Sequence, residues 1–197
     1  MSTPGGLGID GAVITERALS LSTSDHCQVI AESSAVANVR WARNSLTTNG
    51  LSHDVTVTVI AFDHRADGAA AASVTAPLGD ERDLAALVAS ADEAARASAV
   101  ADDAAEFPPT VMDSDYDSQG ADLDVFALAP VTTGIGDLAR WAHSAQIETF
   151  GYAELDVQTV WLASSDGSRR RHVQRSERLE STAKSHARTR STWAGYA

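Results

Sequence analysis

Apolar and polar side chains alternate most clearly in residues 53–62, where valines at every second position are separated by Thr56 and Thr58. A repeat of two residues is typical of a β-strand with one buried face. Three further segments show weaker alternation and are also predicted to be strands: 26–33, 35–48 and 69–76. Asn49-Gly50 favours a tight turn, so it is expected to end the second of these strands.

Two segments near these strands have helical spacing instead. Residues 10–22 predict a short helix, and residues 79–100 predict a longer one in which Asp80 caps the first turn. The longer helix has an apolar stripe at Leu84, Leu87, Val88 and Ala91. Residues 1–100 are therefore expected to form a helix, four strands and a helix, an α+β fold in which helices pack on one face of an antiparallel sheet.

Residues 101–124 have the composition of an acidic linker, with many acids and the pair Pro108-Pro109. Their acids partly match a calcium-binding EF-hand loop, with Asp113, Asp115, Asp117 and Asp124 at the matching positions. The glycine that the loop needs at its sixth position is replaced by Ser118, and the final glutamate is replaced by Asp124. A solvated acidic linker is therefore favoured over a calcium site.

Residues 125–197 are predicted to hold a helix from Thr133 to Ala145 and then a second β-rich region. Within this region, Asp166-Gly167 predicts a hairpin turn. The last residues, STWAGYA, have the character of a strand. Because an open strand edge favours pairing with another chain, we expect this domain to be truncated, with its edge covered by a later part of the polypeptide or by a partner.

Composition restricts the possible functions. The 197 residues carry a net charge of -12, which disfavours a general nucleic-acid binder. The single cysteine, Cys27, excludes an internal disulfide and a cysteine-based zinc site, and it is expected to be an inert core thiol. The sequence contains no secretory signal and no apolar run of membrane-spanning length, so a cytoplasmic protein without a membrane partner is expected.

Catalytic motifs are absent from the sequence. It has no His-Glu-x-x-His, Gly-x-Ser-x-Gly or P-loop pattern. Gly134-Ile135-Gly136 precedes part of the predicted helix and could hold an anion, but an ordinary helix start is favoured because the third glycine of a nucleotide-binding loop is missing. No self-contained active site is therefore expected, and the residues hold no cofactor of their own.

Two groups of polar side chains remain as candidate binding residues. Arg40, Arg43 and Asn44 lie in one predicted strand beside Trp41, and a second group surrounds the predicted hairpin at Arg169, Arg170, Arg171 and Arg175. Arginine and asparagine suit peptide carbonyls, carboxylates and phosphates. The alternative for both groups is a solvated strand face.

The segment VRWARNSLTTNG, residues 39–50, followed by a strand of alternating valines, resembles the TldD/PmbA (TldE) family. These are candidate modulators of DNA gyrase that are regarded as metallopeptidase components. The C-terminal part, from TVWLASSDGSRRRHVQ onward, also resembles the middle region of that family. Trp41 and Arg43 differ from the Phe and Asn of the family pattern, and the linker is unusually acidic.

This resemblance implies a heterodimer that degrades or trims peptides. Its zinc is bound by a His-Glu-x-x-x-His motif of the TldD-like subunit, whereas the PmbA-like subunit lacks that motif. This sequence has no His-Glu pair, so no catalytic residue carries over. The zinc is expected in a TldD-like partner or in a missing C-terminal region, and the chain is more similar to the PmbA (TldE) subunit.

The resulting hypothesis is a non-catalytic part of a TldD/PmbA-type metallopeptidase, with an extended peptide held by strand addition. Arg40, Arg43 and Asn44 would line the peptide groove. The alternative is a non-enzymatic binding or assembly module that uses the basic hairpin, residues 169–175, for an acidic or nucleic-acid partner.

Overall fold

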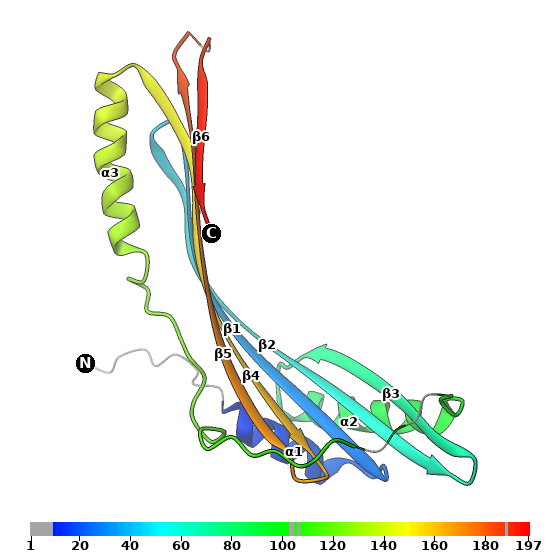
Figure 1. Cartoon of the computed structure of the whole chain (residues 1–197). Coiled ribbons are helices and arrows are strands. Elements are labelled where there is room, and N and C mark those ends of the chain that lie inside the picture. The colour runs from blue at the N-terminus through cyan, green and yellow to red at the C-terminus, as the bar shows by residue number, and fades with distance from the viewer. Residues whose placement is uncertain (1–9, 103–104, 106, 188) are drawn as a thin grey trace. The chain divides into compact units, whose positions relative to one another are not determined.

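The computed structural model describes residues 10–102, 105, 107–187 and 189–197. These residues form a six-stranded antiparallel sheet in the order β3-β2-β1-β4-β5-β6, together with three helices (Figure 1). The elements are α1 (Gly11–Leu21), β1 (His26–Ala42), β2 (Ser45–Arg65), β3 (Gly68–Pro77), α2 (Glu81–Ala97), α3 (Ala129–Ser144), β4 (Ile147–Ser164), β5 (Arg169–Ser185) and β6 (Ser191–Tyr196). The predicted α+β class is confirmed.

The first two predicted strands are wrong in their boundaries. Residues 26–33 and the start of 35–48 form one continuous strand, β1, and Asn49-Gly50 lies inside β2. The turn is instead made by Arg43 and Asn44, whose φ angles are 50° and 64°. Two successive positive φ angles are the signature of the type I′ turn, which matches the twist of a hairpin. Three strands, not four, therefore precede α2.

The chain folds into two compact units whose segments interleave along the sequence. Unit 1 comprises residues 1–33, 54–120 and 158–173, and unit 2 comprises residues 34–53, 121–157 and 174–197. Both units take part of β1, β2, β4 and β5, because these strands run across the boundaries. The expected division into 1–100, 101–124 and 125–197 does not coincide with these units.

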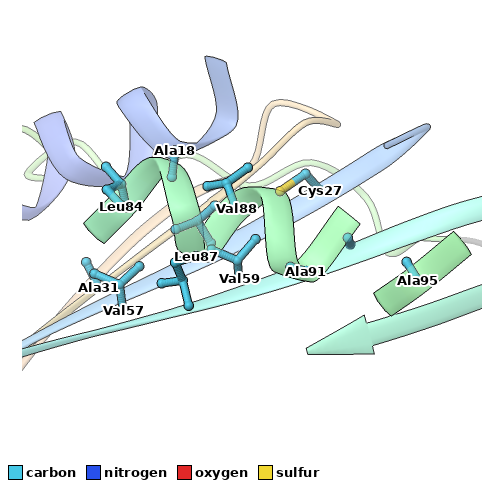
Figure 2. Close-up of a cluster of buried hydrophobic side chains, with 12 residues drawn as sticks. Ala18, Cys27, Ala31, Val57, Val59, Leu84, Leu87, Val88, Ala91 and Ala95 are labelled. Carbon is cyan, nitrogen blue, oxygen red and sulfur yellow. The ribbon is translucent and has the colours of Figure 1, made fainter. Parts of the chain in front are cut away.

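The core of unit 1 joins α1 and α2 to the sheet. Alternate residues of β1 and β2 face the helices, and they are small: Cys27, Val29, Ala31, Val57, Val59 and Ala61 (Figure 2). The predicted stripe of α2 is confirmed, because all four of its residues are buried in this cluster. Short side chains let α2 lie close to the strands, and each buried valine or leucine contributes roughly 1.5–3 kcal/mol. Cys27 is buried in this core, as predicted, and burial raises the pKa of its thiol, which disfavours the reactive thiolate.

Residues 107–120 of the segment that was expected to be a linker are fixed to unit 1, whereas residues 121–124 belong to unit 2. Arg169 donates its N–H to the Val111 carbonyl at 2.7 Å, and Asp113 donates its N–H to the Arg169 carbonyl at 2.9 Å. Farther along, the buried Tyr116 hydroxyl lies 2.5 Å from Thr15 Oγ1 of α1. These backbone and side-chain bonds hold the segment against β5 and α1.

Unit 2 has a separate core beneath α3. Leu128 and Ile135 pack there against β1 and β4, on a face that includes Val39, Trp41 and Leu155. The helix begins at Ala129 instead of Thr133, because Pro130 fits the first turn of a helix. Gly134 and Gly136 therefore lie within α3, and they do not form a loop at its N-terminus. None of the helices in the described residues is long and apolar enough to span a membrane.

One carboxylate links α2 to the loop after α1. Asp92 is only 3% exposed. It accepts hydrogen bonds from the Ser22 and Thr23 hydroxyls at 2.8 Å, from the Thr23 N–H at 2.7 Å and from the Ser24 hydroxyl. Burial is the largest influence and by itself raises the pKa of Asp92, but these hydrogen bonds together lower it below the usual value.

We predict that Asp92→Ala lowers the free energy of unfolding by about 2–3 kcal/mol at pH 7, because three hydroxyls and an amide lose a charged acceptor. Since the folded pKa is depressed, the contribution of Asp92 is present above its unfolded pKa of about 3.9 and is lost as the pH falls through the folded value. Urea unfolding at several pH values measures both effects. The control is Glu93→Ala, at an exposed position of the same helix; an equal loss in both variants would contradict the prediction.

Candidate functional site

The four arginines of the basic hairpin all have acidic partners. In unit 1, Arg169 pairs with Glu16, Arg170 with Asp113 at 3.0 Å, and Arg171 with Asp115 at 2.9 Å. In unit 2, Arg175 pairs with Glu177 at 3.1 Å. The fixed segment thus brings Asp113 and Asp115 to the basic stretch, and all four arginines of that stretch are paired with carboxylates within the protein.

These ion pairs occupy two of the four acids that resemble a calcium loop, Asp113 and Asp115. The Arg171 N–H and then the Arg170 guanidinium lower the pKa of Asp113 by hydrogen bonding to its carboxylate. Asp113 and Asp115 are therefore bound to arginines. Within the described residues, no group of three or more His, Cys, Asp or Glu side chains is arranged to hold a metal ion.

The structure separates the first group of candidate residues. Arg40 lies in β1, whereas Arg43 and Asn44 form the turn that follows it. The Asn44 side chain is fully engaged in unit 2: its Oδ1 accepts from the Thr149 N–H at 2.7 Å and the Thr149 hydroxyl at 2.8 Å, and its Nδ2 donates to the Ile147 carbonyl at 2.8 Å. Asn44 therefore ties the turn to the start of β4, and its side chain is not free to hold a peptide as the sequence suggested.

Arg40 instead belongs to a shallow depression in unit 2. The depression has a volume of about 450 Å³ and is lined by Arg40 of β1, by Gly151, Tyr152 and Glu154 of β4, and by Arg178 and Glu180 of β5. By strand alternation, Arg40 lies on the sheet face opposite Val39 and Trp41, which are buried under α3. The depression is thus on the face that α3 leaves open.

The polar side chains of the depression contact one another in two groups. The Arg40 guanidinium lies 4.9 Å from the centroid of the Tyr152 ring, and the Tyr152 hydroxyl donates to Glu154. Arg178 Nε donates to Glu180 Oε1 at 2.9 Å. Partial burial, followed by the hydrogen bond to Glu154, raises the pKa of Tyr152, so the phenol stays protonated at neutral pH.

A glycine forms part of the floor of the depression. A Cβ atom at Gly151 would lie 2.0 Å from the Trp41 ring and 2.3 Å from the Glu180 carbonyl oxygen. Only glycine lets β4 pass this close to Trp41. The sequence contained only a weak indication that the other lining residues lie together. Tyr152 and Glu154 are two residues apart on a strand, and so are Arg178 and Glu180. Residues at that spacing lie on the same face of a sheet.

Unit 2 also contains an exposed sheet edge. β6 pairs with β5 along one side, from Leu179↔Tyr196 to Lys184↔Ser191, and is the last strand in the sheet order. All six of its residues are exposed, none of them is charged, and Trp193 is 65% exposed. The final strand predicted from the sequence is confirmed. Among the described residues no strand pairs with its other side, so its backbone groups are open there, without the charges that commonly protect such an edge.

A scan with protein-family models gives no match, and a search of curated proteins gives none. Solved structures do match. TldE from Thermococcus kodakarensis superposes with a TM-score of 0.65 and 6% identity, over 93% of this chain and 41% of that one.

The chain has the fold of TldE. Two further structures agree, both named as candidate modulators of DNA gyrase. The protein from Bacteroides thetaiotaomicron has a TM-score of 0.57 and 11% identity, with 94% of this chain and 43% of that one covered. The protein from Thermotoga maritima has a TM-score of 0.55 and 11% identity, with 93% and 42% covered.

The family resemblance predicted from residues 39–50 and the C-terminal hairpin is thus confirmed as a likeness of fold. Identities of 6% to 11% carry no residue roles from these TldE-fold proteins to this chain. The chain spans about two fifths of the length of the structures that it matches.

We predict that Asn44→Ala lowers the free energy of unfolding by about 2–3 kcal/mol, since Thr149 and Ile147 lose three hydrogen bonds and alanine tolerates the positive φ angle poorly. Arg43→Asn, at the neighbouring position of the same turn, should leave stability unchanged or slightly higher, because asparagine tolerates this conformation better than arginine. Chemical denaturation of both variants measures the difference. Equal stability of the two variants would show that Asn44 does not hold the turn.

Proposed function

We propose that this chain is a non-catalytic component of a TldD/PmbA-type zinc metallopeptidase that handles extended peptides. The observation that carries the proposal is the superposition with TldE over 93% of the chain. The absence of a His-Glu pair in the sequence fits a component that leaves zinc chemistry to another polypeptide region. That region belongs to a TldD-like subunit or to a C-terminal domain of the same protein.

The edge of β6 gives the proposal a physical mechanism. An extended peptide can add to an open strand through main-chain hydrogen bonds, which are independent of the peptide sequence. β6 offers six exposed, uncharged residues, and Trp193 provides an apolar contact for peptide side chains. A component that presents unfolded peptides to a peptidase needs this tolerance of sequence.

The alternative function, a basic hairpin that binds an acidic or nucleic-acid partner, has less support. Arg169 and Arg171 have side chains that are only 17% and 11% exposed, and both are paired with carboxylates. A phosphate backbone would have to displace those carboxylates. The ion pairs therefore favour the peptidase component over this alternative.

Co-expression with a TldD-type subunit from the same genome tests the proposal. We expect the two polypeptides to co-elute in size-exclusion chromatography and to cleave an unfolded polypeptide faster together than either does alone. The control is the same pair after zinc chelation, which should retain co-elution but lose cleavage. Separate elution at micromolar concentrations, together with cleavage that is unaffected by this chain, would contradict the proposal.

A further inference from the structure

We propose that the depression around Arg40 binds the terminal carboxylate of an extended peptide, with Arg40 as the recognising residue. The peptide nature of the ligand rests on the proposed function, whereas recognition of a carboxylate rests on unit 2 alone. The first support is the pairing of charges. Arg178 is bound to Glu180 and Glu154 accepts from Tyr152, but no carboxylate in the described part of the chain pairs with Arg40.

Tyr152 holds the Arg40 side chain in place. The Arg40 guanidinium lies over the tyrosine ring, with its Cζ atom 4.9 Å from the ring centroid. A cation over an aromatic face is attracted to it. A contact that favours one position of the side chain reduces the conformational entropy that is lost when a ligand binds. The planar guanidinium can donate two parallel hydrogen bonds to a carboxylate, which a lysine ammonium cannot do in the same geometry.

The charged side chains around Arg40 determine whether the depression favours a carboxylate or a phosphate. Glu154 and Glu180 line the same depression as Arg40 and Arg178, so its four charged side chains sum to zero. Because Arg178 is already bound to Glu180, the one cation left for a ligand among the described residues of the depression is Arg40, which balances the single negative charge of a carboxylate. A phosphate group carries about 1.5 to 2 negative charges at pH 7, so it would keep excess negative charge beside the two glutamates. The site therefore favours a carboxylate over a phosphate.

The surrounding surface suits a peptide chain better than a small acid. The depression, at about 450 Å³, is open and large enough for a terminal residue and part of the next one. On the same sheet face, Trp193 lies directly opposite Thr182, and its ring covers Gly195, the partner of Glu180. An exposed aromatic ring beyond the charged depression can contact apolar side chains farther along the peptide.

The test uses the whole chain and two probes, acetyl-Ala-Ala-Ala with a free carboxylate and the same tripeptide as a C-terminal amide. Binding is followed by NMR through the amide signals of Gly151 and Tyr152. We expect the free acid to bind roughly tenfold more tightly than the amide, as for a charge-assisted hydrogen-bond pair. We also expect inorganic phosphate at the same concentration to leave the signals unchanged.

Arg40→Gln should remove the preference for the acid, whereas Arg140→Gln should keep it. Arg140 is the matched control, because it is an exposed arginine of unit 2 that pairs with Asp137 on α3. Arg40→Lys keeps the charge but loses the planar fork, so it should retain only part of the preference. Thermal unfolding of each variant confirms that it is folded before binding is compared.

Equal binding of acid and amide would overturn the proposal, as would a preference that persists in Arg40→Gln. Displacement of the acid by equimolar phosphate would overturn it too, since it would indicate a general anion site. These results are separable from the proposed function. A carboxylate preference in a chain that fails to join a peptidase leaves the site intact, whereas a productive complex without the preference refutes the site alone.

Discussion

The two-residue turn at Arg43-Asn44 sets the register on which unit 2 depends. Side chains of a strand alternate between faces, so a shift of one residue would exchange the buried and exposed sets. With the turn in this position, Val39 and Trp41 lie in the core and Arg40 lies on the open face. Asn44 fixes the same turn to Thr149 at the start of β4. The core under α3 and the charged depression therefore follow from one local conformation.

Sequence patterns predicted correctly those helices and strands whose form depends on the spacing of their own apolar residues. The stripe of α2 and the valine alternation of β2 both appear in the core of unit 1. The turn was missed because Asn49-Gly50 has the stronger local preference, and tertiary bonds from Asn44 to β4 override it. The ion pairs of Arg170 and Arg171 were missed because their partners, Asp113 and Asp115, lie more than 50 positions away in sequence. Such pairings depend on the topology of the fold, which the alternation of apolar and polar residues does not predict.

The net charge of the protein does not show how its charged side chains are paired within each unit. In unit 1, Asp113 and Asp115 of the predicted acidic linker pair with Arg170 and Arg171 at the start of β5, the stretch that suggested a partner site. In unit 2, the depression on the open sheet face balances two arginines against two glutamates and leaves Arg40 without a carboxylate among the described residues. The fold is that of TldE, and the proposed role in handling peptides uses two features of unit 2, the β6 edge and the Arg40 depression.

The register at Arg43-Asn44 is the central structural claim, and NMR tests it most directly through cross-strand contacts and amide exchange. The account predicts nuclear Overhauser contacts from the Asn44 side-chain amide to Ile147 and Thr149, with slow exchange of the Thr149 N–H. A hairpin centred on Asn49-Gly50, with contacts between residues flanking that pair and rapid exchange at Thr149, would contradict it. That result would place Arg40 in a different environment and remove the basis for the depression.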